Sequence, residues 1–76
     1  MLYVTATIEN NVATVRSVHG KGSLARVVAD RDAVNLGIKA QAIAVQMSDN
    51  SVRPRIGDRL ATVRGEFDIV AVANVG

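Results

Sequence analysis

Residues 52–75 read VRPRIGDRLATVRGEFDIVAVANV, and they carry the strongest local structural signals in the chain. Pro54 fixes its own φ angle and favours extended geometry at the residue before it. Gly57 tolerates a positive φ angle and Asp58 can accept hydrogen bonds from nearby amides, so the two predict a tight turn. Residues 60–63 are Leu-Ala-Thr-Val, a composition typical of a strand.

A second strand is predicted after a polar break at residues 64–66. Apolar side chains at alternate positions from Phe67 to Val75, including Ile69, would share one face of that strand. Period-two alternation is typical of a strand with one buried face. We therefore predict a β-hairpin whose first strand follows a basic turn containing proline.

The first part of the chain predicts another hairpin. Residues 2–8 and residues 12–18 both alternate between apolar and polar side chains. Asn10 and Asn11 lie between them, and asparagine readily adopts the left-handed geometry that a two-residue hairpin loop requires.

The middle of the chain predicts two more strands with a connection between them. Residues 24–29 form a short, mainly aliphatic run, and residues 38–47 alternate between two faces of a strand. Asp30 or Asp32 could cap one helical turn that ends at Gly37, although a long loop fits the same residues.

These elements predict an all-β fold. Five to six strands with turn signals between them indicate a single domain over residues 1–76, built as a small antiparallel β-barrel or sandwich with at most one short helix. The expected core comprises Val4, Ile8, Val15, Val27, Ile43, Val45, Leu60, Phe67 and Ile69.

The composition indicates that this core is thin. The chain has 76 residues, no cysteine, no tryptophan, one tyrosine and one phenylalanine, so disulfides and thiolate metal sites are excluded. A β-rich domain of this size is expected to complete its burial against other subunits or a partner. No segment approaches the ~20 apolar residues of a membrane-spanning helix, and no secretory signal begins the chain. We expect a soluble, intracellular protein with no membrane contact.

Arginine dominates the cations, although the net charge is only +2. Four arginines lie in the C-terminal hairpin: Arg53, Arg55, Arg59 and Arg64. They fit a solvated turn, and they equally fit a positive lip that faces nucleic acid or an acidic partner.

Residues His19, Gly20, Lys21, Gly22 and Ser23 predict a flexible, glycine-rich loop. Two glycines could suggest a phosphate cradle, but the spacing is not that of a P-loop. His19 is the single imidazole, and the sequence places no partner beside it that would orient or activate it.

No catalytic, metal or cofactor site is predicted elsewhere. Asp30 and Asp32 lack the further carboxylates that would complete a cation site. Glu66 and Asp68 would share one face of a strand, but nothing nearby suggests a sugar-sized cleft. Stacking aromatics are also scarce. The sequence therefore predicts that the protein is not an enzyme.

The pattern from Gly37 to Val75 resembles a known family, and two segments in it carry the motifs. Residues 55–60 read RIGDRL and residues 67–72 read FDIVAV. They resemble the R-x-G-D-x-L turn and the F-x-V-x-x-V strand of the head–tail joining proteins of tailed bacteriophages, also called stopper or head-completion proteins. The resemblance covers about half of the chain, and the helical N-terminal segment often present in that family is missing here.

The resemblance implies a structural virion protein, assembled in the host cytoplasm. Such a protein forms a homo-oligomeric ring between the portal or its adaptor and the tail, and it seals the packaged genome. The turn at Arg53 to Arg59 would then contact neighbouring subunits or, without sequence specificity, packaged DNA. Residues 19–23 would be the flexible element that narrows the channel. No cofactor is implied.

Two other classes remain open. The chain could be a small β-barrel module that binds RNA, DNA or a protein. It could also be another phage or bacterial structural protein, such as a capsid decoration protein or a tail component.

Overall fold

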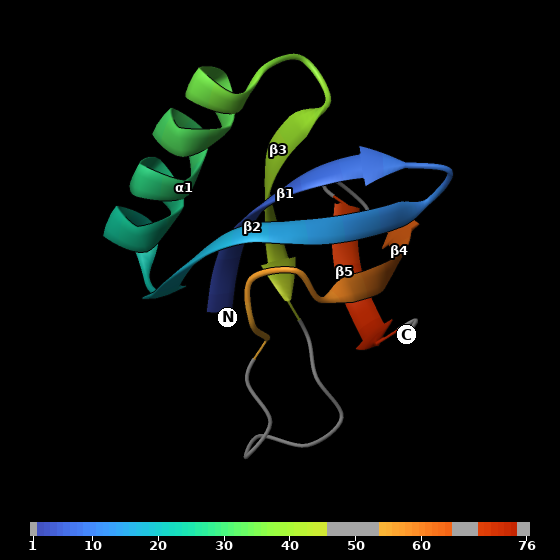
Figure 1. Cartoon of the computed structure of the whole chain (residues 1–76). Helices are drawn as coiled ribbons and strands as arrows, with labels where there is room; N and C mark the ends of the chain where they lie inside the picture. The colour runs from blue at the N-terminus through green and yellow to red at the C-terminus, as the bar shows by residue number, and fades with distance from the viewer. Residues whose placement is uncertain (1, 46–53, 65–68, 75–76) are drawn as a thin grey trace.

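The computed structural model describes residues 2–45, 54–64 and 69–74 (Figure 1). The elements are β1 (Leu2–Glu9), β2 (Val12–Lys21), α1 (Ser23–Leu36), β3 (Ala40–Val45), β4 (Arg59–Arg64) and β5 (Ile69–Asn74). The prediction of an all-β fold with at most one short helix is confirmed in part: the chain is mostly β, but α1, with its 14 residues, is longer than the single helical turn expected.

The five described strands form one strongly curled sheet in the order β1-β2-β4-β5-β3, closed as a barrel. Four of its pairings are antiparallel. The closing pairing is parallel and short, with Ala44 and Val45 of β3 opposite Val70 and Ala71 of β5. The antiparallel arrangement predicted from the sequence is therefore found in four pairings and not in this one.

The N-terminal hairpin is confirmed. Asn10 and Asn11 have φ angles of 52° and 64°, as a two-residue loop between twisted strands requires. The β1–β2 pairing shifts register between Tyr3 and Val4 and again between Thr5 and Ala6. At these shifts the pairing passes over His19 and Arg16, so the extra residues lie in β2. Alternation in β1 is kept: Val4 and Ala6 belong to the barrel core, and Thr5 between them is buried under α1.

The prediction of a strand over residues 24–29 is wrong, because these residues form the first half of α1. A short apolar run fits a strand and a helix equally well from periodicity alone. Ala25, Ala29 and Ala33 recur every four residues and favour the helix, since they give it one small-residue face. Gly37 ends the helix at a φ angle of 118°, as predicted.

The loop predicted over His19, Gly20, Lys21, Gly22 and Ser23 is also wrong. The first three residues continue β2, and Ser23 is the first residue of α1. Gly20 and Lys21 extend the strand because they pair with Tyr3 and Leu2 at the start of β1. Only Gly22, with a φ angle of 99°, joins strand to helix.

The core lies inside the barrel and consists of short aliphatic side chains. It comprises Val4, Ala6, Ala13, Val15, Ile43, Val45 and Leu60, with Ile8 and Val18 packed against it. Five predicted core residues are thus buried and Ile8 is partly buried. The prediction that Val27 belongs to the core is wrong, because its side chain points to solvent from α1. Phe67 and the side chain of Ile69 lie outside the described residues.

Helix α1 packs against β1, β2 and β3, and so covers one side of the barrel (Figure 1). Among the described residues, no helix has both the length and the apolar character needed to cross a bilayer.

Candidate functional site

The turn before β4 is built as the sequence predicts. The backbone amide of Arg55 donates to Oδ2 of Asp58 at 2.8 Å, and the amide of Asp58 donates to the carbonyl oxygen of Arg55 at 3.0 Å. Gly57 has a φ angle of 94°, and Pro54 is buried. The aspartate therefore closes the turn through its side chain and its backbone together.

This turn is fastened to β2. The amide of Gly57 donates to the carbonyl oxygen of Val15, and the amide of Val15 donates to the carbonyl oxygen of Asp58, both at 2.8 Å. The two bonds continue the ladder between β2 and β4 beyond the strand itself. The backbone that carries Arg55 and Arg59 is therefore held by the turn itself and by β2.

Two of the four predicted site arginines can be placed, Arg55 and Arg59, and both are exposed. Arg53 and the side chain of Arg64 lie outside what the structure describes. The structure adds Arg16, which the sequence reasoning did not select. Thr14 of β2 pairs with Arg59, and Arg16 lies two residues further on the same outward face. We refer to Arg16, Arg55 and Arg59 as the arginine surface.

Sequence alternation placed Arg16 on the same strand face as Thr14, but nothing in the sequence shows which strand pairs with β2. The missing information is the β2–β4 register, which joins residues 45 positions apart. No local signal could have supplied it.

A second group, the polar cluster of Thr5, Ser17, His19 and Asp32, lies where α1 meets the barrel. His19 is the expected lone imidazole, but the structure gives it partners. Its Nε2 lies 3.0 Å from the hydroxyl oxygens of Thr5 and Ser17 and 3.4 Å from Oδ2 of Asp32. The His19 side chain is only 10% exposed, so these contacts are largely shielded from water.

The hydroxyl protons in the cluster are directed elsewhere. Thr5 donates to the carbonyl oxygen of Ala29 at 2.8 Å, and Ser17 donates to Oδ2 of Asp32 at 3.3 Å. Since each hydroxyl has one proton, both oxygens act as acceptors toward His19. A carboxylate also only accepts. The Nε2 atom of His19 must therefore carry a proton.

This arrangement is not that of a Ser–His–Asp triad. In a triad the serine donates to one ring nitrogen and the carboxylate orients the other. Here Ser17 and Asp32 both face Nε2 of His19, and the serine proton goes to the carboxylate. The cluster instead links β1 and β2 to α1.

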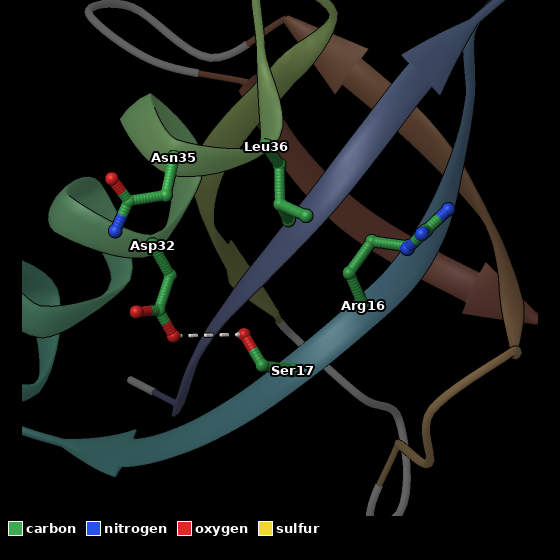
Figure 2. A pocket seen from close by; sticks show the side chains of 5 residues that line it. All are labelled: Arg16, Ser17, Asp32, Asn35 and Leu36. Atoms are coloured by element: carbon green, nitrogen blue, oxygen red, sulfur yellow. Dashed lines mark hydrogen bonds between the residues drawn. The ribbon is translucent and has the colours of Figure 1, made fainter.

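A shallow hollow opens beside the cluster (Figure 2). Its volume is about 320 Å³, and it is lined by Arg16, Ser17, Asp32, Asn35 and Leu36. Figure 2 shows the guanidinium of Arg16 directed away from Asp32. Within the described ranges, no group of three or more His, Cys, Asp or Glu side chains is placed to hold a metal ion, and this includes Asp30 and Asp32.

A third feature is the apolar face of α1, which consists of Leu24, Val27, Val28 and Val34, with the exposed Arg31 on the same side of the helix. These side chains are 76%, 56%, 39% and 80% exposed. The helix buries Ala29 and Ala33 against the barrel instead. The small apolar residues of the helix thus face the barrel and the large ones face solvent. We call this the inverted arrangement of α1.

The chain was compared with protein families, with curated proteins and with solved structures. None of the three comparisons finds a match. The assignment of a function therefore depends on the surfaces described above and on the resemblance of two short segments to the head–tail joining family.

Proposed function

We propose that the protein is a structural virion component of the head–tail joining kind, with no enzymatic role. It forms a homo-oligomeric ring between the portal or its adaptor and the tail, assembled in the host cytoplasm. The observation that carries the proposal is the apolar face of α1.

That face favours assembly because burying aliphatic side chains is worth about 25 cal/mol per Å² removed from water. Monomeric proteins rarely expose contiguous apolar patches above a few hundred Å². Leu24, Val27 and Val34 are all more than half exposed along one side of a helix. A neighbouring copy in a ring would cover them and complete the burial that the small core leaves unfinished.

The turn at residues 54–59 supports the same proposal. It is the part of the chain that carries the resemblance to the joining family, and it is held by Asp58 and by the backbone of Val15. Held in this way, it presents Arg55 and Arg59 at a fixed place on the barrel. In a ring these arginines would face a neighbouring subunit or the channel.

The second candidate is a binding module that works as a monomer. The exposed arginines favour it, since cations on a small barrel attract acidic partners. The two candidates differ in assembly. A joining protein forms rings or binds a portal complex, whereas a module stays small.

The test is the oligomeric state, measured by native mass spectrometry and by light scattering after size-exclusion chromatography. Wild-type protein is expected to form a ring of defined stoichiometry. Val27→Asp is expected to shift it to folded monomers, because a charge in the apolar face would be buried without a partner. Asn10→Asp is the matched control, since it adds the same charge in the β1–β2 turn, where aspartate tolerates a positive φ angle. A wild-type chain that stays monomeric, alone and with portal proteins, would contradict the proposal.

A further inference from the structure

We infer that the arginine surface binds the phosphate backbone of duplex DNA, with Arg16 contributing alongside Arg55 and Arg59. This inference deepens the proposed function, on which it rests, by choosing between the two partners that function allows for the arginine turn. It also adds a residue from a different hairpin.

Strand register brings these cations together. Arg59 lies opposite Thr14, and Arg16 is the next residue on that face of β2. Diagonal neighbours in an antiparallel pair are about 7–8 Å apart, within reach of long side chains. Arg55 lies at the start of the turn that is hydrogen-bonded to Val15, the residue before Arg16. The three arginines therefore project from neighbouring stretches of backbone.

Two carboxylates beside the arginine surface, Asp58 and Asp32, already have hydrogen-bond partners. Asp58 accepts a hydrogen bond from the backbone amide of Arg55 and closes the turn. Asp32 faces Ser17 and His19, while the guanidinium of Arg16 points away from it (Figure 2). Clustered like charges repel one another, and an anionic partner relieves that repulsion.

A nucleic acid fits this surface better than a neighbouring subunit does. The buried centres of protein interfaces are depleted in charge. The apolar face of α1 supplies such a centre, on the side of the barrel where the helix covers β1, β2 and β3 (Figure 1). The arginine surface lies on the β2–β4 pairing and on the turn before β4, where the exposed residues are mainly cations.

Duplex DNA is favoured over a single strand. Proteins that bind single strands stack unpaired bases on aromatic side chains. Within the described residues the single aromatic is Tyr3, which is half-buried. Duplex DNA offers one negative charge per ~1.7 Å of helix axis and needs no stacking platform. The surface is therefore expected to bind weakly and without sequence preference.

The test is fluorescence anisotropy with labelled duplexes of two unrelated sequences at rising salt concentration. Three phosphate contacts predict a slope of about −3 for log K against log salt. Arg16→Ala, Arg55→Ala and Arg59→Ala should each reduce its magnitude by about one. Lys21→Ala is the control, because it removes one positive charge from an exposed position at the end of β2, outside the apolar face of α1 and away from the turn before β4. It should leave the slope near the wild-type value.

Other outcomes would overturn the inference. An equal reduction of the slope with Lys21→Ala would show that net charge alone drives binding. Tighter binding to a single strand, or equal competition by polyglutamate, would assign the surface to another partner. A ring that does not bind DNA would refute this inference and leave the proposed function intact. A monomer that binds DNA and never assembles would refute the proposed function and leave the assignment of the arginine surface intact.

Discussion

The buried hydroxyl of Thr5 on β1 donates a hydrogen bond to the carbonyl oxygen of Ala29 on α1, 2.8 Å away. The hydroxyl oxygen of Thr5 also accepts a hydrogen bond from Nε2 of His19. One side chain thus connects β1, β2 and the helix at a point where Thr5 is fully buried. Since the buried apolar residues of α1 are the small Ala29 and Ala33, polar contacts such as this one and those of Asp32 contribute to its attachment.

Replacing Thr5 with valine is expected to destabilise the protein by about 1–3 kcal/mol. The substitution keeps the shape but leaves the carbonyl oxygen of Ala29 and the Nε2–H of His19 each short of one buried partner. Thr7→Val is the control, because Thr7 is two residues along the same strand and only half-buried. Denaturant unfolding of both variants measures the difference. Equal stabilities would show that the Thr5 hydroxyl contributes nothing to holding α1.

The proton on His19 is a second prediction. Because its Nε2 faces three oxygen acceptors, the neutral ring is expected to be the Nε2–H tautomer. Long-range ¹H–¹⁵N correlation at alkaline pH distinguishes the two ring nitrogens. Nε2 should show the shift of a protonated nitrogen and Nδ1 that of a bare one. A predominant Nδ1–H tautomer would contradict the assigned directions of the Thr5 and Ser17 hydroxyl bonds.

Local signals predicted the five strands that the structure describes and the turns at residues 10–11 and 54–58, because the causes of these elements lie within a few residues. Asn10 and Asn11 adopt left-handed geometry, and Gly57 has a positive φ angle, as their side chains suggest. The helix was missed for the opposite reason. Its apolar pattern at Leu24 and Val27 is real, but it faces solvent, so periodicity predicts a buried strand where a helix packs through alanine.

Of the arginine surface, only the residues that belong to one local segment of the sequence were predicted. Arg55 and Arg59 follow from the turn, whereas Arg16 joins them through strand register. The polar cluster could not be predicted at all. Its contact between Thr5 and Ala29 spans 24 positions, and it requires α1 to pack over the face of β1 that carries Thr5.

The inverted arrangement of α1 predicts opposite effects for two neighbouring substitutions. Val27→Ser should change the free energy of unfolding of the monomer by no more than about 0.5 kcal/mol, because exposed positions tolerate change and the two residues have similar helix propensity. Ala29→Val should destabilise by about 1–3 kcal/mol, because Ala29 is fully buried and extra methyl groups overpack the interface.

These two variants are compared by denaturant unfolding at a protein concentration low enough to keep the chain monomeric. Self-association would otherwise add its own stabilisation. A large loss of stability with Val27→Ser, matched by a small one with Ala29→Val, would mean that the helix packs through its large face.

The last prediction concerns the turn before β4. Gly57 has a φ angle of 94°, and a Cβ added there would meet no atom within 4 Å, so the cost of a side chain is backbone strain alone. Gly57→Val is expected to destabilise by more than ~1 kcal/mol, because a β-branched residue is strained at positive φ. Ile56→Val is the control, since Ile56 is 73% exposed in the same turn. The amide of Gly57 also bonds to the carbonyl oxygen of Val15. Strain at this residue should therefore loosen the turn from β2 and lower the melting temperature. A Gly57→Val protein that melts with the control would show that the turn tolerates other backbone angles and that Asp58 alone maintains its shape.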